Sequence, residues 1–145
     1  MPDTSYPPAT VPVHIRFRDL DAYGHVNNAV FFTYLEEARI TLIGDHFRVE
    51  MSEETVFVVA QAACSYKLPV EYDVELFVTM TVREMRRASF TVDYVLTDRA
   101  GTEYATAETT LVAFDPVSRR AASIPEWLDG ALREAAAKWP PLPGM

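Results

Sequence analysis

The segment Arg16–Arg39, RFRDLDAYGHVNNAVFFTYLEEAR, constrains the fold most, because it joins the end of a strand, a polar turn and a long helix. Asparagine is a favoured helix N-cap, since its amide oxygen accepts a free N–H of the first turn. Asn27 and Asn28 therefore predict where the helix starts. A helix N-terminus carries partial positive charge and free N–H donors. A carboxylate just upstream would lie beside an oxyanion site, the pair of groups that acyl-transfer hydrolysis needs.

The helix is expected to run from Asn28 to about Phe47 and to cover a sheet. Its apolar residues recur at the spacing of one helical face. These residues are Phe31, Leu35, Ala38 and Leu42. Glu36, Glu37 and Arg39 fall outside this stripe. Gly44 and Asp45 leave open whether the helix ends or kinks before Phe47.

The remaining segments predict a five-stranded, mostly antiparallel sheet and a short C-terminal helix. Alternating apolar residues predict strands at 11–18, 74–85, 89–96 and 104–114, with a glycine hairpin at 98–101. The segment 55–66 begins with consecutive apolar residues, which predicts a strand buried on both faces. The last helix is expected from Ile124 to about Lys138, with Ser123 as its N-cap and Trp127 on its apolar side. This is an α+β layer arrangement in which one helix leaves much of the sheet for another subunit to cover.

Length and charge limit the organisation and the partners. With 145 residues, the chain is expected to form one domain at 11–138, between a disordered arm at 1–10 and a Pro-rich tail at 139–145. The formal net charge of −8 argues against nucleic acid or an anionic membrane as a partner. An anionic ligand would therefore need a local basic patch.

Cysteine usage and hydropathy point to a cytoplasmic protein without a metal site. The single cysteine, Cys64, cannot form an internal disulfide, and no Cys/His spacing suggests a metal. No apolar run approaches the ~18 residues of a membrane span. The N-terminal sequence has neither the basic nor the apolar region of a signal peptide. A cytoplasmic location is expected, where a single reduced thiol is ordinary.

The pattern R-x-R-D-L-D-A-x-G-H-V-N-N-x-x-F-x-x-Y-L-E-E-A-R resembles the hotdog-fold acyl-CoA thioesterases of the 4-hydroxybenzoyl-CoA thioesterase type, in the branch that carries the H-V-N-N turn. The similarity in layout runs from about Val13 to Phe114. It implies a hotdog fold, in which the sheet wraps the long helix, and hydrolysis of an acyl-CoA to a free acid and CoA without a cofactor. It also implies homodimers, often paired into homotetramers, with active sites at the subunit boundary.

The resemblance assigns the catalytic residues. Asp21 occupies the place of the nucleophile or general base that acts on the thioester carbonyl. The backbone N–H of Asn28 would point at the thioester oxygen. Some relatives have histidine at this place, whereas an asparagine side chain cannot act as acid or base. His25 would then steady Asp21, contact the substrate or simply pack. Without a catalytic role, Asp21 would be an Asx-turn residue and Asn28 an N-cap.

Other residues are expected to bind the substrate. The substrate would contact Gly24, Asn27, Phe31, Phe32, Tyr34 and Val59, and acyl selectivity would come from Phe31, Phe32, Tyr34 and the strand Val56–Val59. The phosphates of CoA would contact Arg86, Arg87, Ser89 and Lys67, with Arg119 and Arg120 as weaker candidates. Arginine suits this role because its planar fork matches phosphate geometry, although most arginine pairs are simply solvated turns. Asp19 is expected to be structural, capping a turn or pairing with Arg16 or Arg18.

Two other functions stay open. A hotdog hydratase or dehydratase would act at the β-carbon of an acyl thioester and would need a histidine–acid pair across the pocket, with His25 as the histidine. A non-catalytic acyl-CoA-binding dimer is the second, because one fold hosts many functions. Thiol release separates the expected hydrolase from both.

Overall fold

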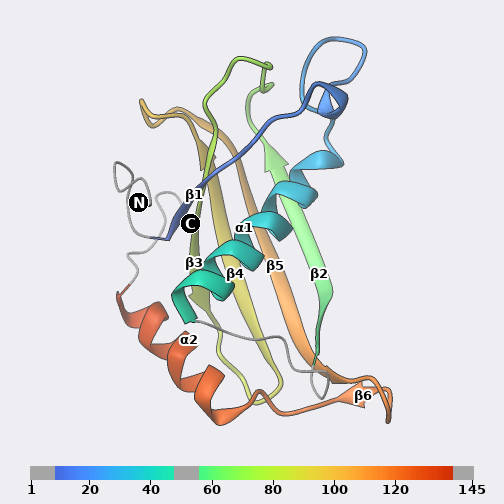
Figure 1. Ribbon diagram of the computed structural model, residues 1–145, viewed down its shortest axis with the longest axis vertical. Helices are drawn as coiled ribbons and strands as arrows, with labels where there is room; N and C mark the ends of the chain where they lie inside the picture. Colours follow the sequence, from blue (N-terminus) through green and yellow to red (C-terminus); the bar gives the residue numbers. More distant parts are fainter. Residues whose placement is uncertain (1–8, 48–55, 139–145) are drawn as a thin grey trace.

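The computed structural model describes residues 9–47 and 56–138 (Figure 1). Within these ranges a long helix lies across one face of an antiparallel sheet, as predicted. The elements in chain order are β1 (Thr10–Pro12), the 3-10 helix η1 (Phe17–Asp19), α1 (Val30–Phe47), β2 (Val56–Tyr66), β3 (Phe77–Arg83), β4 (Ser89–Thr97), β5 (Glu103–Asp115), β6 (Arg120–Ala121) and α2 (Glu126–Lys138). The strand order is β1-β3-β4-β5-β2, with β6 on β5.

Helix α1 packs its predicted stripe onto the sheet. The four stripe residues Phe31, Leu35, Ala38 and Leu42 are all buried. They share one core with the inward-facing side chains of β4, including Phe90, Val92 and Leu96. Each such side chain contributes about 1.5–3 kcal/mol by leaving water. Gly44 and Asp45 lie within α1, so the helix does not end before Phe47.

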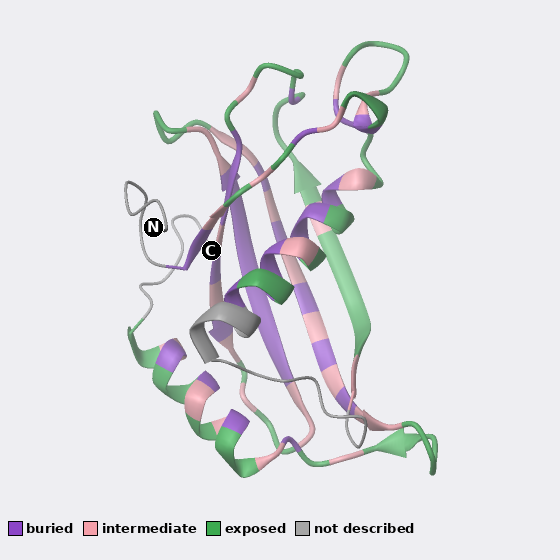
Figure 2. Cartoon of the chain, viewed as in Figure 1, coloured by how far each residue is buried: buried purple, intermediate pink, exposed green. Residues whose placement is uncertain are grey.

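The prediction for the segment 55–66 is wrong in one respect. It forms β2, but β2 is an edge strand that pairs only with β5, and most of its side chains are exposed. Figure 2 shows the contrast with β4, which is buried along nearly its whole length. An apolar run predicts burial but not which neighbours supply it. In this chain, no described strand lies on the outer side of β2.

The two ends of the domain also differ from the predictions. The first strand is only Thr10–Pro12, so it is much shorter than 11–18, and η1 follows. Proline lacks the N–H that continues a ladder, which is consistent with this early end. Thr10, the last residue of the predicted arm, already belongs to β1; residues 1–8 and 139–145 lie outside the described part of the chain. The short strand β6 was not predicted.

The C-terminal helix α2 starts later than predicted and packs beside β3. Its first residue is Glu126, and the Ser123 hydroxyl accepts a hydrogen bond from Arg87 and, among the described residues, from no helix amide, so Ser123 is not the N-cap. Leu128 and Leu132 are buried as expected, but Trp127 is 55% exposed. In the described ranges, no helix combines the length and the apolar character that crossing a membrane requires.

Candidate active site

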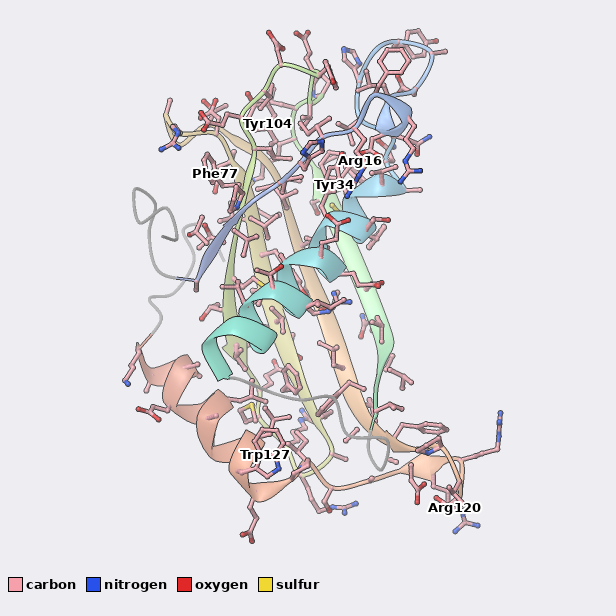
Figure 3. The ribbon with its side chains drawn as sticks, viewed as in Figure 1. Arg16, Tyr34, Phe77, Tyr104, Arg120 and Trp127 are labelled. Atoms are coloured by element: carbon pink, nitrogen blue, oxygen red, sulfur yellow. The ribbon has the colours of Figure 1, made fainter. Side chains whose placement is uncertain are left out.

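A buried carboxylate fixes the turn between η1 and α1. Asp19 Oδ2 accepts hydrogen bonds from the Arg16 amide at 2.9 Å and from the Tyr34 hydroxyl at 2.7 Å. The Asp19 carbonyl also accepts the Asn27 amide at 2.8 Å. Burial works to raise the pKa of Asp19, but the hydrogen bonds from Arg16 and Tyr34 lower the pKa below its usual value. Asp19 is therefore structural, as predicted, and ties the turn to the helix; the two residues that donate to it, Arg16 and Tyr34, are labelled in Figure 3.

Asp21, two residues later, stands in a different environment. Its Oδ1 accepts the amides of Tyr23 at 2.9 Å and His25 at 3.2 Å, and its own amide donates to the His25 carbonyl at 2.7 Å. Gly24 closes this loop with a φ of +80°, a conformation that favours glycine. The side chain is exposed, and within the described chain Oδ2 has no hydrogen-bond partner. The Asx turn thus positions the carboxylate and leaves one oxygen available.

The start of α1 supplies a free donor. Asn27 Oδ1 accepts the Ala29 amide at 2.9 Å, so Asn27 rather than Asn28 caps the helix. The Asn28 carbonyl accepts the Tyr66 hydroxyl at 2.8 Å. The Asn28 amide donates to no group among the described residues. An N–H at the positive end of a helix dipole can therefore serve an external acceptor.

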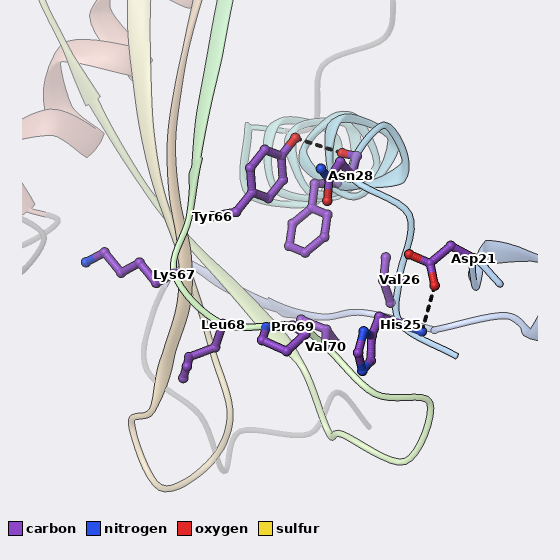
Figure 4. A pocket seen from close by; sticks show the side chains of 10 residues that line it. Asp21, His25, Val26, Asn28, Tyr66, Lys67, Leu68, Pro69 and Val70 are labelled. Atoms are coloured by element: carbon purple, nitrogen blue, oxygen red, sulfur yellow. Dashed lines mark hydrogen bonds between the residues drawn. The ribbon is translucent and has the colours of Figure 1, made fainter. Parts of the chain in front are cut away.

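These groups line one pocket of about 270 Å³ (Figure 4). Its lining residues are Asp21, His25, Val26, Asn28, Phe31, Tyr66, Lys67, Leu68, Pro69 and Val70. The predicted catalytic residues thus come together, with Phe31 and Lys67 from the predicted binding residues. Tyr66 packs edge-on against Phe31, with ring centroids 5.0 Å apart.

The other predicted substrate contacts do not line this pocket. Gly24 and Asn27 shape the turn, through its positive φ and the helix cap. Tyr34 is 1% exposed and donates to Asp19, so it belongs to the core. Burial and the Asp19 carboxylate both raise the Tyr34 pKa. Phe32 and Val59 are partly exposed, on α1 and in the middle of β2.

Sequence reasoning missed the wall that the segment 66–70 builds. The hydrogen bond from the Val26 amide to the Val70 carbonyl, at 2.8 Å, brings this segment against the turn. The contact joins residues that are far apart in the sequence, so no local sequence pattern predicts it. Lys67 was predicted as a phosphate contact and Pro69 as the end of a strand, but neither as part of this wall.

The predicted phosphate-binding residues lie at the other end of the sheet. Ser89 pairs with Val112 of β5, whereas Tyr66 at the pocket pairs with Ala105, roughly 23 Å further along the strand. Arg86 and Arg87 precede Ser89, and the Arg87 guanidinium donates to Ser123. Arg119 and Arg120 follow β5 towards this same end of the sheet. In a single chain these arginines and the pocket are separate. Lys67 does line the pocket but pairs with Glu103 at 3.1 Å.

The site offers carboxylate chemistry rather than thiolate chemistry. Burial raises the pKa of Cys64, so its thiol is poorly ionised. Across residues 9–47 and 56–138, no three or more His, Cys, Asp or Glu side chains gather as metal ligands would. A free carboxylate oxygen near an unpaired amide can attack a carbonyl carbon or activate water while the amide holds the oxygen.

Comparison with known proteins identifies relatives over most of the chain. The family model for the thioesterase-like superfamily matches residues 15–132. The long-chain acyl-CoA thioesterase FadM of Escherichia coli K12 is 30% identical over 125 residues, covering 84% of this chain and 92% of FadM. The acyl-CoA thioester hydrolase YbgC of E. coli O6:H1 is 26% identical over 118 residues, covering 79% of this chain and 88% of YbgC.

A solved structure is also similar to this chain. A thioesterase from Thermus thermophilus, crystallised with coenzyme A and Zn, superposes with a TM-score of 0.74 at 31% identity. The superposition covers 90% of this chain and 96% of that one.

Proposed function

Because this chain belongs to the thioesterase-like superfamily and has its hotdog fold, we propose that it is an acyl-CoA thioesterase, which hydrolyses the thioester of an acyl-CoA to a free acid and CoA. The observation that carries the proposal is that Asp21 and Asn28 line the same pocket. Asp21 offers an unpartnered carboxylate oxygen, and Asn28 offers an amide at the start of α1 that has no acceptor in the described chain.

The proposed mechanism places the thioester carbonyl between these two groups. The Asn28 N–H and the dipole of α1 would stabilise the negative charge that develops on the carbonyl oxygen. As a general base, Asp21 would take a proton from water while the water oxygen attacks the carbonyl carbon. Collapse of the tetrahedral intermediate then expels the CoA thiolate, which takes up the proton.

A nucleophilic route fits the same geometry. Asp21 would attack the carbonyl carbon directly and release the CoA thiolate, leaving an acyl–aspartyl anhydride that water hydrolyses. In both routes the backbone amide of His25 holds Asp21 Oδ1 in place, and the His25 side chain faces the same pocket.

We also propose that two copies are needed for a complete site. β2 is a long edge strand with exposed apolar side chains, a feature that proteins normally cover. Antiparallel pairing of two β2 strands would place the Val56 end of one copy beside the Tyr66 end of the other. Arg86 and Arg87 of the second copy would then lie at the same end as the pocket of the first. The resemblance extends this arrangement to a tetramer of two dimers.

The activity is tested by thiol release from a panel of acyl-CoAs of different lengths, including aromatic ones, followed with a disulfide dye. We expect release of one thiol per acid formed. An enoyl-CoA in the panel separates hydrolysis from water addition, because addition removes the ultraviolet absorbance of the conjugated thioester without releasing thiol. Saturable binding of CoA without thiol release on any substrate would overturn the proposal.

The assembly is tested by sedimentation of the wild type and of a Val58→Lys variant in the middle of β2. We expect a dimer or tetramer for the wild type and a shift towards monomer for the variant, since a desolvated lysine disfavours the interface. A wild type that stays monomeric at assay concentrations while remaining active would contradict a shared site.

A further inference from the structure

One buried cation has no role in the proposed hydrolysis. Arg39 on α1 is only 7% exposed, although its sequence position falls outside the apolar stripe. Its guanidinium donates to the Tyr94 hydroxyl at 3.1 Å, and that hydroxyl lies 2.6 Å from the Thr109 hydroxyl. Both hydroxyl residues are essentially inaccessible to solvent. Three polar side chains therefore form a small cluster inside an otherwise apolar core.

The charge of Arg39 is not compensated within the described chain. Arg39 forms no ion pair with a carboxylate in residues 9–47 or 56–138, and a neutral hydroxyl accepts only one of its five N–H groups. Its neighbours on the helix do not help, because Glu37 pairs with Arg16 and Glu36 is exposed. A buried guanidinium without an anion is costly, since it has left water without a charged partner. A carboxylate would supply the anionic partner that Arg39 lacks among the described residues.

The cluster and the catalytic pocket lie along the same two elements, β2 and α1. Tyr66 lines the pocket, and the same face of β2 continues through Cys64 to Ala62, which pairs with Thr109. From Tyr66 to Ala62 the strand advances roughly 13 Å. From Phe31, also in the pocket, to Arg39 the helix advances about 12 Å. Measured along either element, the cluster therefore lies at a similar distance from the pocket. This distance matches the length of a medium-chain acyl group.

The face of β2 between the pocket and the cluster carries exposed side chains. Ala62 and Tyr66 are exposed on this face of β2, and so is Val59 further along it. An acyl chain entering from the pocket can therefore lie against apolar side chains of β2. The far end of the acyl chain would reach Arg39, the one buried charged residue of α1 that has no ion-pair partner within the described ranges.

We propose that Arg39, with Tyr94 and Thr109, binds a carboxylate at the far end of the acyl group. The preferred substrate class would be medium-chain acyl-CoAs that end in a carboxylate. This inference rests on the proposed thioesterase activity. The arginine fork can donate two N–H groups to one carboxylate, while the Tyr94 hydroxyl, itself paired with Thr109, accepts another of its N–H groups and holds it in place.

The kinetic test compares sebacoyl-CoA with decanoyl-CoA, whose acyl groups have the same length and differ at the far end. We expect the wild type to prefer sebacoyl-CoA in kcat/KM. Arg39→Met should lower the ratio of the two kcat/KM values by roughly tenfold to a hundredfold, because a charge-assisted hydrogen bond is lost. Tyr94→Phe should lower the ratio less. Arg133→Met, a change of an exposed arginine on α2, is the matched control and should leave the ratio unchanged.

A ratio that does not respond to Arg39→Met would overturn the inference while leaving the thioesterase proposal intact. If neither substrate is hydrolysed, the thioesterase proposal is decided by the wider acyl-CoA panel, and calorimetric binding of free sebacate against decanoate decides the inference. We expect sebacate to bind the wild type and not Arg39→Met. Equal binding of sebacate to both proteins would count against the site.

A carboxylate from a second copy of the chain is the competing partner for Arg39. Glu36 is an exposed acid on the same helix, so it is the first residue to change. If Glu36→Gln weakens the oligomer in sedimentation as much as Arg39→Met does, and the substrate ratio stays constant, Arg39 is an interface residue and the inference is wrong.

Discussion

Two aspartates, two residues apart in the same turn, have opposite surroundings. Asp19 is buried, and one of its oxygens accepts two hydrogen bonds, from the Arg16 amide and the Tyr34 hydroxyl. Asp21 is exposed at the pocket, with one oxygen held by amides of its own loop and the other oxygen free among the described residues. Each aspartate has one oxygen that accepts two hydrogen bonds, so the difference lies in burial and position: the buried Asp19 ties the turn to α1, and the exposed Asp21 is available to react at the pocket.

The largest expected effect is loss of turnover in Asp21→Asn. The amide keeps the shape of the side chain and can still accept the Tyr23 and His25 amides, but it is neither a base nor a nucleophile. We expect kcat for acyl-CoA hydrolysis to fall by about 10²–10⁴-fold, with an unfolding free energy within about 0.5 kcal/mol of the wild type. Steady-state kinetics and urea denaturation of the same preparation check both parts. Wild-type turnover would show that Asp21 has no chemical role.

Asp19→Asn should give the reverse pattern. The two hydrogen bonds to a charged oxygen become bonds to a neutral amide, which we expect to cost about 1–3 kcal/mol of unfolding free energy. Denaturant titration measures this cost. The kcat of the fraction that remains folded should stay closer to the wild type than that of Asp21→Asn. A stable Asp19→Asn with abolished turnover would reverse the two assigned roles.

The fold was predictable where one local pattern decides the structure. The stripe of α1 and the alternation in β4 fixed a helix on an antiparallel sheet. The exposure of β2 was not predictable, because an apolar run such as Val56–Val59 is the same whether a neighbouring strand belongs to the chain or to another copy. The burial of Arg39 was not predictable, because the charge of an arginine by itself predicts a position at the surface.

Only one side of the candidate site was predictable, because a local sequence pattern specifies only residues that are close together in the chain. Asp21, His25 and Asn28 come from one contiguous turn, so the motif contains them all. The opposing wall, from Tyr66 to Val70, reaches the turn only through tertiary pairing. The partner of Asp19 was likewise missed: the sequence suggested a neighbouring arginine, whereas the structure adds the hydroxyl of Tyr34 from within α1.

Acid should sharpen the contrast between the two aspartates. Because the pKa of Asp19 is lowered in the folded state, its charged form stabilises the fold above the ordinary aspartate pKa of about 3.9. That contribution is lost as the pH falls through the lower, folded-state pKa. We expect the unfolding free energy of the wild type to drop more steeply below pH ~4 than that of Asp19→Asn.

Some slope will remain in Asp19→Asn. Asp98 and Asp115 also have lowered pKa values, chiefly because the amides of Thr102 and Val117 donate to them. Identical acid slopes for the wild type and Asp19→Asn would contradict the structural role given to Asp19.

The smallest expected effect is that of Tyr66→Phe. This change removes the hydroxyl that donates to the Asn28 carbonyl and leaves the ring on Phe31. A net hydrogen bond is worth about 0.5–1.5 kcal/mol, so kcat/KM should fall by no more than about tenfold if the bond helps to orient the start of α1. Kinetics on one acyl-CoA suffice, with Tyr23→Phe, an exposed tyrosine in the Asp21 loop, as the control.

The most direct test of the central claim is a crystal structure of the Asp21→Asn variant with an uncleaved acyl-CoA bound. The account predicts that the thioester carbonyl oxygen accepts a hydrogen bond from the Asn28 amide at about 2.7–3.1 Å, with the substituted side chain facing the carbonyl carbon. A thioester bound away from the start of α1, with the Asn28 amide still unoccupied, would contradict it.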